Sequence, residues 1–254
     1  LSKVFPPEIY DKHPEFFPME KWKRIRPPEG AEWWNPDLGR EDVANFAAEK
    51  AKLFFDNNPK ELTFSVGTND GMVYGDSRET RAMVLPQKWF RGRPDYSNLV
   101  FNFTNRVAEK LEPTHSDKYV GALAYYWAEN VPDFPLNPHV IPFLTADRSQ
   151  GYDFDFLEEE LNLQRKWARS LQEGLRLAGN VSPPLRIGLY DYTHSRGFII
   201  PRMHTELIGL MLREAKRSGF TDYCAGVRWA TALVSGSTTV GFGTICWGFI
   251  RRVL

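Results

Sequence analysis

Short apolar runs alternate with longer segments of helical periodicity along most of this chain, and this alternation constrains the fold more than any other feature. Runs of strand length lie at 62–66, 119–126, 139–145, 185–190 and 220–224. Other segments repeat apolar residues at steps of three and four, as amphipathic helices do. They predict helices over 41–57, 100–111, 157–178 and 204–214. Strands that alternate with helices favour an α/β fold with a parallel sheet and helical crossovers.

A parallel sheet of this kind belongs either to a (β/α) barrel or to a doubly wound sheet. The chain contains neither GxGxxG nor GxxxxGK[ST], which argues against the nucleotide-binding form of the doubly wound sheet. A closed barrel needs eight strands, whereas five runs of strand length are visible here. We therefore expect a (β/α) barrel that is incomplete in this chain.

Three stretches of different composition divide the chain. Residues 1–40 are crowded with proline and aromatic residues, so we expect a cover segment without long helices. Residues 41–226 carry the barrel pattern. From Tyr223 to Leu254 there is no Asp or Glu and no helical period, so we expect residues 227–254 to be an atypical tail of non-native coding sequence. Reading the gene in all three frames tests that expectation.

Charge and cysteine content exclude several classes of partner. Lys+Arg and Asp+Glu both number 32, so nothing indicates binding to nucleic acid or to an anionic membrane. Cys224 and Cys246 form no CxxC pair, and the 5 histidines form neither HxH nor HExxH. We therefore expect no metal and no cofactor. No apolar run of about 18 residues is present, so no membrane insertion is expected.

Four of the predicted strands run into or near an acidic residue. In chain order these acids are Asp70, Glu129, Asp147 and Asp191. The carboxyl ends of parallel strands form the active face of a barrel, so these side chains are expected to face one mouth. Glycoside hydrolysis needs two carboxyl groups, one as general acid and one as nucleophile or base. The four acids are therefore the candidate catalytic residues.

Polar and aromatic residues next to these acids are candidates for binding an oligo- or polysaccharide. Aromatic faces hold sugar rings, and polar side chains bind sugar hydroxyls. The candidate substrate-binding residues are Asn69, Tyr126, Trp127, Arg148, Tyr192 and His194. Tyr74 adds a further ring near the first acid.

Each candidate also has a purely structural interpretation. Asn69-Asp70-Gly71 is a common turn sequence, and an Asp after a strand often caps the next helix. Asp147-Arg148 can be a local ion pair, Glu129 can be a solvated loop residue, and His194 can be an ordinary loop histidine. Catalysis is therefore a hypothesis for each acid separately.

Three segments resemble the bacterial domain of unknown function 4838. They are His13-Pro14-Glu15-Phe16-Phe17, the FSVGTNDG turn at 64–71 and KYVGALAYY at 118–126, and the resemblance covers about residues 8–222. That family resembles barrel glycoside hydrolases, including α-glucuronidase-like and hexosaminidase-like enzymes. The resemblance implies a parallel (β/α) barrel of glycoside-hydrolase type and favours a secreted or periplasmic location. It supplies no established catalytic residue.

Two departures from that family bear on the site. Many members place cysteines shortly after the Asn-Asp-Gly turn, where this chain has Met72-Val73-Tyr74-Gly75-Asp76. The last strand of the family usually leads to an acid, whereas Cys224-Ala225-Gly226 stands here. We therefore expect one catalytic carboxylate to be missing from this chain.

Competing functions follow from these features. In the first, the chain hydrolyses glycosidic bonds with a pair of the four acids. In the second, it is a non-catalytic carbohydrate-binding domain with tryptophans as stacking platforms. These tryptophans are Trp33, Trp34, Trp89 and Trp127. In the third, the tryptophans are core residues and the site lies in another part of the protein.

Overall fold

A computed structural model describes residues 1–28, 31, 34–71, 74–147, 154–177, 179, 186–192 and 205–226. Its main sheet consists of β3 (Thr63–Ser65), β6 (Tyr119–Ala124), β7 (Val140–Asp147), β8 (Gly188–Tyr192) and β9 (Asp222–Gly226). These five strands pair in the order β3-β6-β7-β8-β9. All five correspond to predicted runs, and the prediction of an α/β fold with a parallel sheet is confirmed.

The strand order in the sheet is the same as the order along the chain. A (β/α) barrel is wound in this way, whereas a doubly wound sheet reverses its strand order at a switch point. The topology is therefore consistent with an incomplete (β/α) barrel.

The chain divides into two compact units. The first comprises Leu1–Phe143 and Arg169–Arg186, and the second comprises Leu144–Ala168 and Ile187–Leu254. The boundary passes through β7 and through α4 (Phe154–Leu177), so each of these elements contributes to both units.

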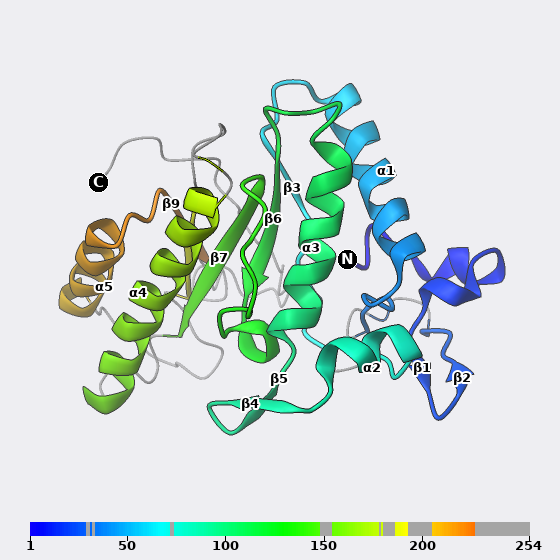
Figure 1. Ribbon diagram of the computed structural model, residues 1–254, viewed down its shortest axis with the longest axis horizontal. Helices are drawn as coiled ribbons and strands as arrows, with labels where there is room; N and C mark the ends of the chain where they lie inside the picture. The colour runs from blue at the N-terminus through cyan, green and yellow to red at the C-terminus, as the bar shows by residue number, and fades with distance from the viewer. Residues whose placement is uncertain are drawn as a thin grey trace, which may run out of the picture. The chain divides into compact units, whose positions relative to one another are not determined.

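In the first unit, α1 (Glu41–Asn57) and α3 (Ser97–Leu111) pack side by side, and α3 also contacts β6 (Figure 1). The buried residues of α1 include Ala47, Ala51 and Phe55, which are spaced as one face of a helix. The bounds of α1 agree with the prediction. Helix α3 begins at Ser97, before its predicted start at 100, and the backbone N of Ser97 donates to Asp95 Oδ1 at 2.9 Å.

The described residues of the N-terminal segment form no long helix, which agrees with the prediction from its prolines. It contains the short helices η1 (Pro7–Asp11) and η2 (Pro14–Phe16). Phe17 and Trp34 are buried, and their rings stack with centroids 4.8 Å apart. The segment therefore contributes aromatic side chains to the core of the first unit.

Two hairpins and one helix of the first unit have no counterpart in the predicted elements. They are β1 (Met19–Glu20) with β2 (Lys23–Arg24), β4 (Lys88–Phe90) with β5 (Arg93–Asp95), and α2 (Arg78–Val84). Both hairpins close with two residues of positive φ, which are Lys21 and Trp22 in the first and Arg91 and Gly92 in the second. In Figure 1, β4, β5 and α2 lie beyond the first turn of α3.

The second unit contains the ladder of β8 and β9 together with α5 (Thr205–Arg217). The strands are parallel, with Gly188 opposite Asp222 and Tyr192 opposite Gly226. Arg165 Nε of α4 donates to Glu214 Oε1 of α5 at 2.7 Å. The predicted tail at 227–254 lies outside the described residues. None of the helices in the described part of the chain is long and apolar enough to cross a membrane.

Candidate functional site

In the second unit, two of the predicted acids stand at the carboxyl ends of neighbouring strands. Asp147 is the last residue of β7, and Asp191 is the fourth residue of β8. Strand β8 extends two residues beyond its predicted end, so Asp191 lies in the strand and not in the following loop. Neighbouring strands lie about 4.8 Å apart, so the two positions lie near the same edge of the sheet.

Asp191 is completely buried and has a defined partner. The hydroxyl of Tyr223, on β9, donates a hydrogen bond to Asp191 Oδ2 at 2.8 Å. The Asp191 carboxylate is therefore held in a fixed position by a residue of the neighbouring strand. The other candidates of this unit, Arg148 and His194, lie outside the described residues, and Tyr192 ends β8.

In the first unit, the turn after β3 is held by asparagine side chains. Asn69 N donates to Asn35 Oδ1 at 2.8 Å, and Asn69 Nδ2 donates to Trp34 O at 2.5 Å. Asn35 Nδ2 in turn donates to Gly71 O at 3.0 Å. Asn69 therefore fixes the turn to the N-terminal segment, and Asp70 stands exposed at the surface.

Glu129 directly follows the short helix η3 (Tyr126–Ala128) after β6 and is bound by two arginines of the β4–β5 hairpin. Its Oε1 pairs with Arg91 Nη1 at 2.7 Å, and its Oε2 pairs with Arg93 Nη2 at 3.1 Å. The Glu129 side chain is only 9% exposed. Two guanidinium groups favour an ionised carboxylate, so Glu129 is poorly suited to act as a general acid.

The aromatic residues at the end of β6 differ in exposure. The predicted strand 119–126 ends at Ala124, and Tyr126 begins η3 with φ +51 and 43% exposure. The guanidinium carbon of Arg93 lies 4.4 Å from the centroid of the Tyr126 ring. Trp127 is buried against Tyr126, with centroids 4.8 Å apart in a T-shaped arrangement. Only Tyr126 of this pair therefore presents a ring to solvent.

Tyr74 is buried, and its ring lies 4.6 Å from that of Tyr96. Burial raises the pKa of both hydroxyls, so both tyrosines stay neutral through the ordinary pH range. Tyr74 therefore packs in the interior and is not available to a sugar, whereas Tyr96 is partly exposed.

The tryptophans expected as stacking platforms separate into two groups. Trp34 and Trp127 are buried, as in the interpretation that assigns them to the core. Trp89 is 65% exposed on β4, opposite Pro94. Trp33 lies outside the described residues. Trp89 is thus the one described member of the set that can stack on a ligand.

Arg91 and Arg93 are the residues of this region that the sequence pattern did not identify. The β4–β5 hairpin that carries them is short. The sequence signal that could have predicted it is the two-residue turn Arg91-Gly92 between the paired residues Phe90 and Arg93. The contact with Glu129 joins residues 36 or more positions apart. Such a contact has no local signature.

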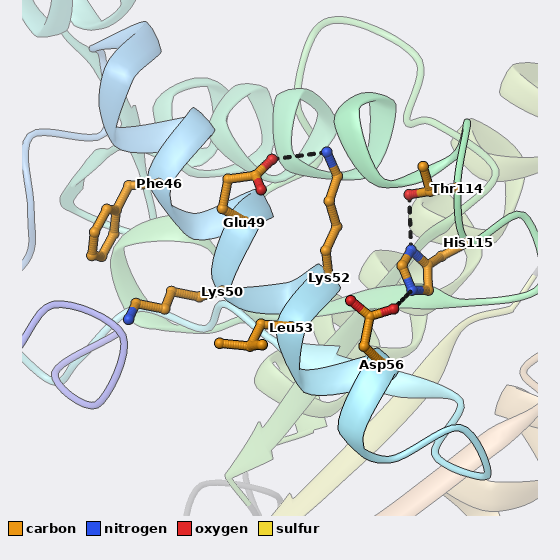
Figure 2. Close-up of a pocket in the computed structure, with 8 residues that line it drawn as sticks. All are labelled: Phe46, Glu49, Lys50, Lys52, Leu53, Asp56, Thr114 and His115. Carbon is orange, nitrogen blue, oxygen red and sulfur yellow. Dashed lines mark hydrogen bonds and ion pairs between the residues drawn. The ribbon is translucent and has the colours of Figure 1, made fainter.

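A hollow of about 570 Å³ lies on a different part of the first unit, along α1 (Figure 2). It is lined by Phe46, Glu49, Lys50, Lys52, Leu53, Asp56, Thr114 and His115. His115 Nε2 lies 3.3 Å from Asp56 Oδ1, and its Nδ1 lies 2.8 Å from Thr114 Oγ1. Thr114 and His115 precede β6 and so lie at the amino end of the strands, whereas barrels bind substrates at the carboxyl end. The hollow is therefore not the candidate site.

In the described part of the chain, no group of three or more His, Cys, Asp or Glu side chains is arranged to hold a metal ion. The candidate residues fall into two sets, one in each unit. In the second unit they are the aspartates at the carboxyl ends of β7 and β8, and in the first unit they are Glu129 with its two arginines and the exposed ring of Tyr126.

Comparison with known proteins bears on the family and not on the chemistry. A family model described as Domain of unknown function (DUF4838) matches residues 1–228. No curated protein and no solved structure was found to match the chain. The family match covers most of the 254 residues and confirms the resemblance stated on three sequence segments. The chain therefore belongs to the DUF4838 family.

Proposed function

We propose that this chain is a carbohydrate-active domain that hydrolyses glycosidic bonds, with Asp147 and Asp191 as its carboxylate pair. The observation that carries the proposal is that β7 and β8 are neighbours in the sheet and each has an aspartate at its carboxyl end, Asp147 as the last residue of β7 and Asp191 as the last but one of β8. A glycosidase needs two carboxyl groups about 5–9.5 Å apart, and the spacing of about 4.8 Å between neighbouring strands is compatible with such a separation.

The two acids would divide the roles that glycoside hydrolysis requires. Asp191, whose carboxylate is held by the hydrogen bond from Tyr223, would act as nucleophile or base. Asp147 would donate the proton to the leaving oxygen.

Hydrolysis of a panel of oligo- and polysaccharides by the full chain tests the proposal. We expect Asp147→Asn and Asp191→Asn to remove hydrolysis while glycan binding persists, because each variant keeps the shape of the side chain and loses its proton chemistry. Asp155→Asn is the matched control, since Asp155 is an exposed aspartate in the first turn of α4. Full activity in both strand-end variants would rule out this carboxylate pair.

A non-catalytic carbohydrate-binding domain is the second candidate. It is favoured by the engagement of Glu129 with Arg91 and Arg93, together with the exposure of Trp89 and Tyr126. Glycan binding without turnover, unchanged in Asp147→Asn and Asp191→Asn, would identify this function in place of hydrolysis.

A further inference from the structure

Buried polar atoms without partners gather at the end of β6. Arg93 Nε, Ser97 Oγ and Trp127 Nε1 have no hydrogen-bond partner among the described residues. They lie on adjoining elements, because Tyr96 N donates to Trp127 O at 2.7 Å and Arg93 covers the Tyr126 ring. Each of the three atoms can donate a hydrogen bond. Buried donors are rarely left unpaired in native proteins, so this place calls for a ligand that accepts.

The backbone at the same place is in an unfavourable conformation. Tyr126 has φ +51, in the left-handed region that side chains other than Gly, Asn and Asp seldom adopt. The other non-glycine residues with positive φ in the described part of the chain are Lys21, Trp22 and Arg91, all in two-residue hairpin turns. Tyr126 has no such turn to explain it. Strain of this kind concentrates at binding sites, and here it presents an aromatic ring to solvent.

The carboxylates near these donors already have partners. Glu129 accepts from Arg91 and Arg93, and Asp95 accepts from Ser97 N at 2.9 Å and from Asn130 Nδ2 at 2.8 Å. Asp133 pairs with Lys88, the first residue of β4, and accepts a hydrogen bond from Asn98 Nδ2 at 2.8 Å. None of these carboxylates accepts from the three donors, so an acceptor supplied by a ligand would satisfy them.

We propose that the end of β6 is a subsite for an acidic sugar unit. Arg93 and Trp127 donate to a carboxylate or sulfate group of the sugar, and the exposed ring of Tyr126 contacts the sugar ring. Carboxylates and sulfates only accept hydrogen bonds, which matches a site whose free atoms are donors. The inference rests on the proposed function, since it takes the ligand to be a glycan.

The probes are pairs of glycans, one with its acidic groups and one from which the acidic groups have been removed. Calorimetric titration of the full chain would use oligomers of galacturonate, glucuronate and mannuronate, sulfated galactan oligomers, and each oligomer after carboxyl reduction or desulfation. We expect at least one acidic oligomer to bind at least tenfold more tightly than its neutral counterpart. The uronate and sulfate arms distinguish the two sources of negative charge. A single-stranded oligonucleotide tests the other class of polyanion, which the zero net charge of the chain disfavours.

The variants Tyr126→Asn and Trp22→Asn form a matched pair. Each variant replaces an exposed aromatic residue that has positive φ and an arginine over its ring. Asparagine tolerates this backbone conformation. Tyr126→Asn is expected to weaken binding of the acidic oligomer at least tenfold without lowering the urea midpoint. Trp22→Asn, on the β1–β2 hairpin, is expected to leave the affinity unchanged. Equal affinities in the two variants would overturn the assignment of Tyr126.

Arg93→Gln tests the recognition of charge. It should weaken binding of the acidic oligomer at least tenfold and leave the affinity for the neutral counterpart unchanged. Arg93→Lys keeps the positive charge but lacks the Nε donor, and the same titrations are made with this variant if the glutamine variant does not fold. Binding of neutral oligomers alone would overturn this inference and leave the proposed function standing. Binding of the oligonucleotide alone, or of no oligomer at all, would overturn both.

Discussion

Replacing Asp37 with alanine is expected to lower the free energy of unfolding by about 3–5 kcal/mol. Asp37 is completely buried in the first unit and ties three parts of it together. Its Oδ2 pairs with Arg24 Nη1 at 2.7 Å, and its Oδ1 accepts from Ser77 Oγ and Thr80 Oγ1, each at 2.7 Å. Alanine would leave a largely buried guanidinium group and two buried hydroxyls without their acceptor, and unpaired buried groups are costly. Urea denaturation followed by circular dichroism measures the change.

The matched control is Asp11→Asn. Asp11 belongs to the same N-terminal segment and also pairs with an arginine, through two bonds to Arg26 at 2.9 and 3.2 Å. Both partners of this pair are exposed, so its loss should cost less than about 1 kcal/mol. Similar losses in the two variants would mean that burial does not set the strength of the Asp37 interactions, contrary to this prediction.

The main sheet could be predicted because its signals are local. Strand β6 is an apolar run of strand length, and α1 and α4 each repeat apolar residues over several turns. Such patterns arise because buried faces must be continuous, and they are visible without knowledge of the rest of the chain. Boundaries were less certain. Strand β8 runs on through Asp191 and Tyr192, and β6 stops before Tyr126, whose positive φ breaks the extended conformation.

The hairpins and α2 could not be predicted in the same way. Strands β1 and β2 have two residues each, too few for a period to be recognised. Their turn, Lys21-Trp22, holds two residues of positive φ although it contains neither Gly nor Asn. Its conformation follows from tertiary contacts, such as the hydrogen bond from Asp76 N to Met19 O at 2.7 Å. A single sequence does not display contacts of that range.

Part of the candidate site has local signals for the same reason. Asp147 and Asp191 were predicted to follow strands, and they lie at the carboxyl ends of β7 and β8, because this prediction depends only on where strands end. Their catalytic role stays a prediction. The ion pairs of Glu129 are made with two arginines of a hairpin that precedes β6 in the chain. The turn at Asn69 is held by hydrogen bonds to Asn35 and Trp34. In both cases the chemistry is decided by partners 34 or more residues away.

Gly39→Ala is expected to lower the free energy of unfolding by about 3 kcal/mol, at the upper end of the usual cost of overpacking. A Cβ atom at position 39 would meet the backbone nitrogen of Thr80 and would lie 2.7 Å from the carbonyl carbon of Glu79. Both atoms belong to the backbone of α2 near its start, where Ser77 Oγ accepts from Thr80 N. Backbone atoms of a capped helix cannot move aside as a flexible side chain can, so α2 would be displaced. Urea denaturation measures this change as well.

Gly121→Ala is the control, because a Cβ atom there would have only Phe64 O within reach, at 4.0 Å. We expect a change within about 1 kcal/mol, since alanine also restricts the unfolded chain. The double variant Asp37→Ala/Gly39→Ala separates local from shared effects. Both single changes release α2 from the segment at Asp37, so their combined cost should fall below the sum of the two. If the two losses of free energy add fully, Gly39 and Asp37 act on α2 independently. The close approach at Gly39 would then not be needed for the hydrogen bonds between α2 and Asp37.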